Sequence, residues 1–229
     1  MKLFVSTALL LAASALSPSG FASCPKGPHT LYSQHAVSLD SDLVRVRSPD
    51  KKKILIVERV WDDKSAEGVY FSFTVEAAGR TLTTRLEGYT NGEVLWAPDS
   101  SAFAVTATNN CGATAFVFSI KQRDLDRVDV DSAVQKAFGM PVKCEISVGA
   151  NTGIIDWQEG SDRLLIAAEV TPCSFCECSG MYEVYDVDLR QRRIAGSYTQ
   201  MAAKKKFWKL LGCELRDADN GCAERLQTK

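Results

Sequence analysis

A single pattern of short apolar strands separated by polar turns recurs three times along the chain, and it restricts the fold more than any other feature. In each copy a turn is followed by an apolar strand and then by a strand in which apolar and polar residues alternate. The apolar strands begin at Ile54, Phe103 and Leu164, which are 49 and 61 residues apart. Strands in such short succession pair as antiparallel hairpins, and recurrence at this period is typical of stacked β-sheet repeats.

The first copy shows the pattern most clearly. Leu43–Arg47 partly alternates, and Ile54–Val57 is a continuous apolar run that predicts a strand buried on both faces. Tyr70–Ala77 alternates, with its aromatic residues on one face. Gly79-Arg80 predicts a hairpin turn into a strand over Thr81–Leu86.

Two helices are expected outside the strands. Asp131 and Ser132 can cap a short helix that runs to Phe138 and stops at Gly139. Near the C-terminus an apolar stripe at helical spacing is flanked by Lys204–Lys206 and Lys209; its members are Ala203, Phe207, Leu210 and Leu211. We expect this helix to pack on the edge of the sheet; the alternative is a basic helix that rests on anionic lipid.

The turns between strands carry a resemblance to a known family. Ser48-Pro49-Asp50 and Trp96-Ala97-Pro98-Asp99-Ser100 resemble the turn of TolB-type β-propeller repeats, and the third copy, Trp157 to Asp162, keeps the tryptophan but lacks the proline. Proline presets φ for the second position of such a turn, and aspartate can accept a bond from a nearby backbone N–H. The resemblance implies antiparallel propeller-like repeats, three of them visible, in an open or degenerate propeller with a short C-terminal helix. The alternative is a β-sandwich.

The number of repeats bears on how the fold closes. Closed propellers have at least about four blades, whereas three copies are visible here. We therefore expect an open arc, a four-bladed ring completed by Cys24–Asp42, or part of a dimer. The expected division is a signal peptide at 1–23, an N-terminal segment at 24–42, the β-propeller-like domain at 43–200, and a C-terminal helix with a disulfide tail at 201–229.

The first 23 residues read as an export signal. Lys2 precedes an apolar stretch over Leu3–Leu16, and small residues follow a Pro-Ser-Gly break. We therefore expect a periplasmic or extracellular protein. Phe21-Ala22-Ser23-Cys24 resembles a bacterial lipoprotein box, which would put a lipid anchor on Cys24, and we expect contact with a membrane only in that case.

Export changes how the eight cysteines are interpreted, because thiols oxidise outside the cytoplasm. All eight are candidates for disulfide bonds: Cys24, Cys111, Cys144, Cys173, Cys176, Cys178, Cys213 and Cys222. Cys213 and Cys222 flank a turn-rich segment and are the simplest pair. The cluster Cys173, Cys176 and Cys178 predicts a loop held by disulfides, and its alternative is a soft-metal or redox site.

Function is the part on which the sequence says least. The net charge of −1 offers no reason to bind nucleic acid. The chain contains none of the common nucleotide-binding, serine-hydrolase or zinc-protease motifs and only two histidines. We therefore expect no catalytic residues and no cofactor, and a non-enzymatic envelope module that binds a protein or a glycan. The alternatives are a thiol-based metal-binding or redox protein and an envelope hydrolase.

Overall fold

The computed structural model describes residues 31–64, 66–109, 112–139, 149–171 and 178–218 of the 229-residue chain. Within these ranges the protein is mainly β and forms three antiparallel sheets with a few short helices, so the predicted fold class is confirmed. None of the helices described has the length and apolar character that a bilayer crossing requires.

Each sheet is a meander of four successive strands, and the middle sheet gains one further short strand. The first sheet contains β2 (Leu43–Arg47), β3 (Lys53–Trp61), β4 (Val69–Ala77) and β5 (Arg80–Glu87). The middle sheet contains β1 (Val37–Ser38), β6 (Asn91–Trp96), β7 (Ala102–Asn109), β8 (Gly112–Ile120) and β9 (Leu125–Val128). The third contains β10 (Asn151–Trp157), β11 (Arg163–Glu169), β12 (Tyr182–Asp188) and β13 (Arg193–Thr199).

Four short helical elements accompany these strands. They are α1 (Asp131–Phe138), the 3-10 turn η1 (Glu159–Ser161), α2 (Gln200–Phe207) and α3 (Cys213–Asp217). Val134 and Phe138 of α1 join the core between the middle and third sheets. Ala203 and Phe207 of α2 pack with Leu215 of α3 on the third sheet.

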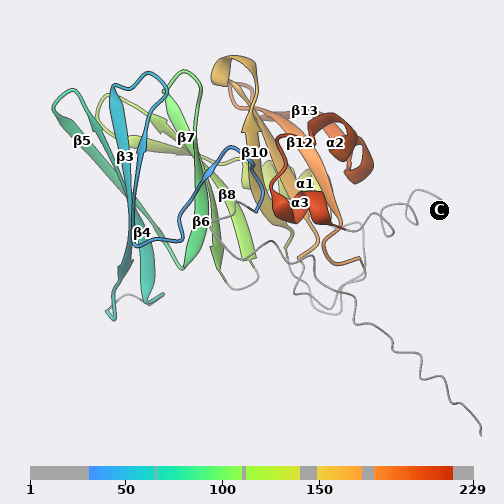
Figure 1. Ribbon diagram of the computed structural model, residues 1–229, viewed down its shortest axis with the longest axis horizontal. Helices are drawn as coiled ribbons and strands as arrows, with labels where there is room; N and C mark the ends of the chain where they lie inside the picture. Colours follow the sequence, from blue (N-terminus) through green and yellow to red (C-terminus); the bar gives the residue numbers. More distant parts are fainter. Residues whose placement is uncertain (1–30, 65, 110–111, 140–148, 172–177, 219–229) are drawn as a thin grey trace, which may run out of the picture.

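The three sheets lie face to face in series, as Figure 1 shows from β5 on one side to β13 on the other. One apolar core joins the first sheet to the middle sheet and contains Phe73, Phe103 and Phe118. Another joins the middle sheet to the third and contains Val117 and Ile166. The middle sheet is therefore covered on both faces, which goes beyond a two-sheet sandwich and gives a propeller-like stack.

The same turn begins the second strand of each sheet. In the first sheet Ser48 N donates to Lys53 O at 3.0 Å, and Lys51 N donates to Ser48 O at 2.9 Å. The turns of the other two sheets begin at Ala97 and Gln158. In each, the backbone of the first residue makes the same two bonds as that of Ser48. The fourth residue of each turn has positive φ: 61° at Lys51, 63° at Ser100 and 59° at Ser161. The third copy is thus a true repeat although it lacks the proline.

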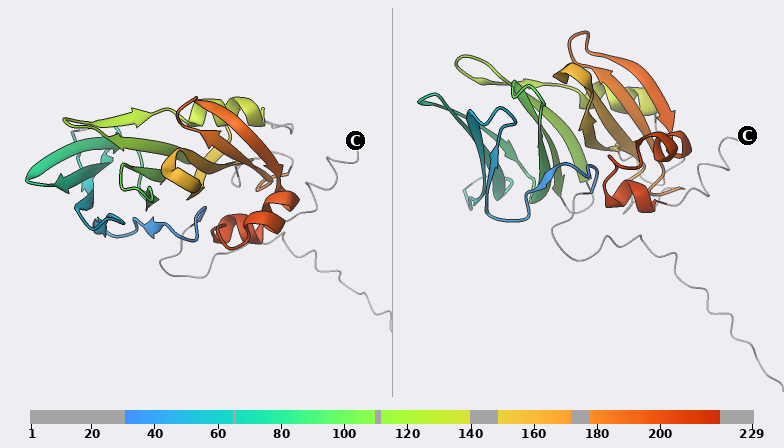
Figure 2. Two further views of the ribbon diagram at one scale, coloured as in Figure 1. Left: turned by 90° about the horizontal axis from the view of Figure 1, so that it is seen from above. Right: turned by 45° about the horizontal axis from the view of Figure 1, so that its top comes forward.

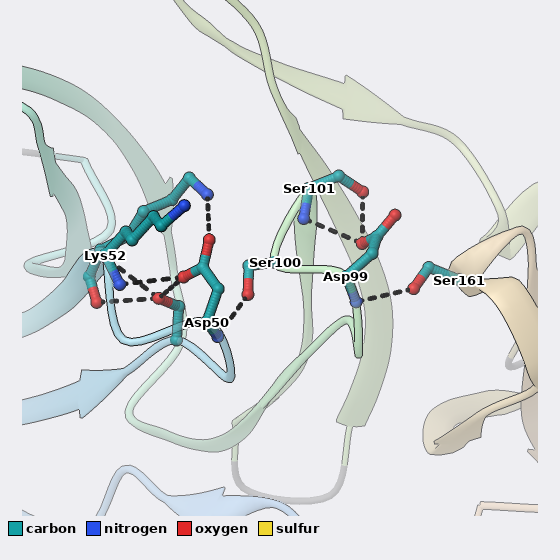
Figure 3. Close-up of polar contacts among 8 residues, drawn as sticks. Asp50, Lys52, Asp99, Ser100, Ser101 and Ser161 are labelled. Carbon is teal, nitrogen blue, oxygen red and sulfur yellow. Dashed lines mark hydrogen bonds and ion pairs between the residues drawn. The ribbon is translucent and has the colours of Figure 1, made fainter.

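These turns also bond to one another. Asp50 N in the first turn donates to Ser100 Oγ in the second at 3.0 Å, and Asp99 N in the second donates to Ser161 Oγ in the third at 3.1 Å (Figure 3). The carboxylate of Asp99 accepts from Ser101 within its own turn. One backbone donor and one serine oxygen therefore link each repeat to the next.

The tryptophans repeat a second link between sheets. Trp96 Nε1 donates to Val46 O in the first sheet at 3.2 Å, and Trp157 Nε1 donates to Leu95 O in the middle sheet at 3.4 Å. Val46 and Leu95 occupy the same place, two residues before their turns. The aromatic residue of the motif thus anchors each repeat to the one before it.

The first sheet differs from the prediction on one of its faces. Leu55 and Val57 are buried, but Ile54 and Ile56 are only half-buried, so the interpretation of this run as a strand buried on both faces was wrong. The physical reason is position, since this sheet is at one end of the series and no described element covers its second face.

Two local predictions need smaller corrections. The hairpin between β4 and β5 turns at Ala78 and Gly79, both with positive φ, while Arg80 already pairs with Ala77. Helix α1 has the predicted bounds and ends at left-handed Gly139, but its N-cap is Val130, which makes no side-chain bond. Asp129 Oδ1 accepts from Ser132 N instead.

The N-terminal segment fastens the middle sheet to the C-terminal helices. This segment is blue in Figures 1 and 2. Its strand β1 pairs with β6, and its Ser33 forms a β-bridge with Leu211. The fit is close, because a Cβ on Gly153 would lie 2.1 Å from the Tyr32 ring. Residues 31–42 therefore add an edge strand and a strap, not a fourth sheet.

The bond between turns predicts a measurable loss of stability when its acceptor is removed. We expect Ser100→Ala to lower the free energy of unfolding by about 1–2 kcal/mol, because it leaves the Asp50 N–H without its partner. Urea denaturation measures the difference. The matched control is Ser41→Ala, at an exposed serine outside the turns, which should change stability by less than about 0.5 kcal/mol. Equal effects of the two substitutions would contradict the role given to Ser100.

Candidate functional site

The most site-like feature of the described residues is a groove between the outer strands of the first and middle sheets. Two adjoining cavities, of about 240 and 490 Å³, share Thr114, Phe116 and Arg127 in their linings. β5 and β9, whose residues contribute to the walls, are the edge strands of their sheets. We call the combined space the interblade groove, lined by Arg85, Tyr89, Thr114, Phe116, Arg127 and Asp131.

The interblade groove has an aromatic centre. The rings of Tyr89 and Phe116 meet edge to face with centroids 5.7 Å apart. The guanidinium of Arg127 lies over the Phe116 ring, 5.7 Å from its centroid. Aromatic rings with an arginine guanidinium stacked over them recur at recognition surfaces.

Charged groups of both signs surround this centre. Arg85 pairs with Glu87 at 2.9 Å, which offsets its charge. Asp131 is half-buried; desolvation raises its pKa, and its carboxylate accepts from Gln135 Nε2 at 2.9 Å and from Thr152. The groove therefore offers hydroxyl, guanidinium and carboxylate groups around apolar rings, a combination suited to holding a polar ligand by many contacts.

Sequence reasoning did not identify the interblade groove. Asp131 was considered only as a cap for the helix that runs to Phe138, and Phe116 was not singled out. No local signal could have joined them to Tyr89, because the groove forms between strands of two different repeats.

A second unusual feature lies beneath the N-terminal strap. Glu93 and Glu169 are both buried, and Tyr32 contacts each of them: its backbone N donates to Glu93 Oε1 at 2.9 Å and its hydroxyl donates to Glu169 Oε2 at 2.8 Å. Among the described residues, Glu93 Oε2 and Glu169 Oε1 have no hydrogen-bond partner.

Burial keeps these two carboxyl groups protonated near neutral pH. It raises the pKa of Glu93 to about 8, although backbone N–H groups of the strap favour the charged form. Burial, together with the charge of Glu214, also raises the pKa of Glu169 to about 8. Because Glu169 is completely enclosed, we assign the pair to the attachment of the strap and not to substrate chemistry.

The cysteine cluster was predicted to be a loop held by disulfides, with a metal or redox site as the alternative. It falls mostly outside the described residues, since Cys173 and Cys176 are not among them. Cys178 and Cys213 are the two cysteines that are described, and both are disulfide-bonded. A disulfide sulfur carries no thiolate, so Cys178 in this state lacks the form that binds a soft metal. The pairings, including Cys213 with Cys222, stay predictions, as do the roles of Cys24, Cys111 and Cys144. No group of three metal-ligating side chains occurs in the described part of the chain.

One histidine–carboxylate pair was not anticipated. His35 Nδ1 lies 2.9 Å from Asp156 Oδ2, at a bulge in β10. Within the ranges that the structure describes, no hydroxyl or thiol bonds to the other ring nitrogen of His35. The pair joins the strap to the third sheet and lacks the nucleophile that a catalytic triad needs.

The buried carboxyl groups predict an unusual dependence of stability on pH. Between pH 4.5 and about 8 both stay protonated in the folded chain but ionise in the unfolded chain, so raising the pH through this window should lower the free energy of unfolding. Glu93→Gln with Glu169→Gln should remove most of this loss. Urea denaturation of the wild-type chain and of the double variant, each at pH 5 and at pH 8, measures the loss of stability.

The control for this prediction is Glu76→Gln, since Glu76 is exposed on the first sheet. This variant should lose as much free energy of unfolding between pH 5 and pH 8 as the wild-type chain does. A double variant that loses as much stability as the wild type between the two pH values would show that these two carboxyl groups are not its source.

Comparison with known proteins adds little to this description. No protein-family model matches the chain, and no curated protein does. Among solved structures, the acylaminoacyl peptidase of Pyrococcus horikoshii (orthorhombic crystal form) is 14% identical over 73% of this chain, with a TM-score of 0.41. The match covers 26% of that protein, so this chain spans about a quarter of its length.

Proposed function

We propose that the protein is an exported, non-enzymatic β-repeat module that binds a glycan or protein partner in the cell envelope through the interblade groove. The observation that carries the proposal is the Arg127–Phe116–Tyr89 centre, in which an exposed arginine lies over half-buried aromatic rings between two sheets, bordered by polar groups of both signs. A sugar ring or a peptide side chain can rest on such a surface while hydroxyl, guanidinium and carboxylate groups fix its orientation.

We also infer that the three sheets are TolB-type propeller repeats. The support lies in the turns, which keep the same two backbone bonds, the same positive-φ position and the same serine link in successive copies. Propeller repeats present loops and strand edges for recognition, which agrees with a binding role.

The two alternatives have less support. A thiol-based metal-binding or redox protein would use Cys173, Cys176 and Cys178, of which Cys178 is already disulfide-bonded. An envelope hydrolase would need a nucleophile or an activated water beside an acid–base group, and the exposed His35–Asp156 pair supplies only part of that set.

The binding proposal predicts that changes within the interblade groove weaken binding selectively. We would screen the purified chain against neutral and acidic oligosaccharides and against a peptide library, and measure each hit by calorimetry. Arg127→Gln and Thr114→Glu should each weaken the binding of a true ligand at least about tenfold, equivalent to about 1.4 kcal/mol. The first removes the cation over Phe116, and the second places a larger, charged side chain in the space shared by both cavities.

The matched control is Arg123→Gln, an exposed arginine in the turn before β9 that does not line the interblade groove. It should leave binding unchanged. Ligands that bind all three variants equally well would rule out the groove as the binding site, and turnover of a bound oligosaccharide or peptide would favour the hydrolase alternative.

Export makes a separate prediction about the N-terminus. We expect the mature chain, by intact mass, to begin at Cys24, with an acyl group on that residue if the lipoprotein box is used. Leu10→Arg should block export, because a charge within the apolar stretch disrupts the signal. A cell-fractionated chain that retains residues 1–23 would contradict this proposal.

A further inference from the structure

The C-terminal helical region carries a concentration of positive charge that the partner-binding role does not use. Between Gln200 and Gly212 the chain has four lysines and no acidic residue, although its overall net charge is −1. The lysines are Lys204, Lys205, Lys206 and Lys209. A local excess of this kind in a chain with slightly negative net charge indicates attraction to an anionic surface.

The fold decides which of these lysines face solvent freely. Lys204 Nζ bonds to Ala218 O, and Lys206 Nζ donates to Tyr198 Oη at 2.8 Å while lying 4.4 Å from that ring's centroid. Lys205 and Lys209 are exposed, and no acidic side chain among the described residues forms an ion pair with either. Their charge is therefore available to a partner.

Large apolar side chains accompany these two lysines. Met201 and Trp208 are 36% and 50% exposed, whereas Ala203 and Phe207 on the other side of α2 are buried against the third sheet. Met201 and Lys205 lie on α2, and Trp208 and Lys209 lie in the turn that directly follows it; at helical spacing the four share one face. We call these four residues the lysine face; Figure 1 shows α2 at the outer end of the series of sheets.

This combination fits a lipid surface better than a nucleic acid. The negative surface potential of an anionic membrane attracts lysines that lie close to it. Tryptophan favours the headgroup region of a bilayer, where its ring is apolar and its N–H remains hydrated. The exposed Met201 on the same face adds apolar area that a phosphate backbone would not use.

The start of the described chain bonds to residues that follow this surface closely in the sequence. Glu214 N donates to Leu31 O at 3.1 Å, and Gly212 N donates to Tyr32 O at 2.8 Å. Cys24 is only seven residues before Leu31, a length of chain that can extend about 24 Å. A signal sequence or a lipid attached there would therefore hold the lysine face within reach of the same membrane.

We propose that the lysine face, formed by α2 and the turn that follows it, binds anionic phospholipid bilayers, with Trp208 at the level of the headgroups. The contact uses residues remote in sequence from the interblade groove and does not require the proposed partner. It also does not require acylation of Cys24, since charge and an interfacial tryptophan together attract the chain to the bilayer.

The test uses the purified chain, after intact mass has shown no acyl group. It is mixed with vesicles of phosphatidylcholine alone or of phosphatidylcholine with phosphatidylglycerol. We expect co-sedimentation only with the anionic vesicles, a blue shift of tryptophan fluorescence, and a loss of binding as salt is raised from about 0.05 to 0.5 M. Lys205→Gln with Lys209→Gln should weaken binding at least tenfold, and Trp208→Phe should abolish the blue shift.

The matched control is Lys51→Gln with Lys52→Gln, which makes the same change of charge at two exposed lysines in the first turn. It should bind as the wild type does. Equal loss in the two double variants would show that only net charge matters, and equal binding to neutral vesicles would remove the electrostatic basis; either result overturns the proposal. Two further results would together show a general polyanion site instead. They are competition by duplex DNA with anionic vesicles for the wild-type chain, and undiminished binding of that DNA to the Trp208→Phe variant.

Discussion

The structure depends on the need of each antiparallel sheet to bury apolar side chains on its faces. The middle sheet satisfies this need on both sides, with Phe103 and Phe118 toward the first sheet and Val117 toward the third. Burial of apolar area is non-directional, however, and does not by itself fix how one sheet sits on the next. The directional part comes from the serine and tryptophan bonds between repeats, which connect the same positions in successive sheets.

The ends of the series are finished in different ways. Helices α2 and α3 cover the third sheet, and the strap of residues 31–42 ties those helices back to the middle sheet through β1 and the Ser33–Leu211 bridge. The first sheet has no described cover on its second face, where Ile54 and Ile56 are half-buried and Leu43 is 52% exposed. Among the described residues the series of sheets therefore has two unlike ends.

Both proposed interaction surfaces lie where the regular stacking of the sheets ends. The interblade groove opens where β5 and β9, the edge strands of adjacent sheets, leave space that the apolar cores do not fill. The lysine face is the outer side of a helix whose inner side caps the third sheet. In each case one side of an element supports the core, which leaves its other side to carry charge and aromatic groups.

The sequence by itself determined the type and order of nearly all the strands, the repeat, and helix α1, because alternation, turn residues and a glycine stop are local properties of the chain. It could not reveal that Tyr32 covers Glu93 and Glu169, that His35 meets Asp156, or that Tyr89 lies against Phe116. Those contacts join residues from about 27 to 137 positions apart. Only the stacking of whole sheets decides them, and it also decided that Ile54 and Ile56 are half-exposed, since the burial of an apolar strand depends on whether another layer lies against it.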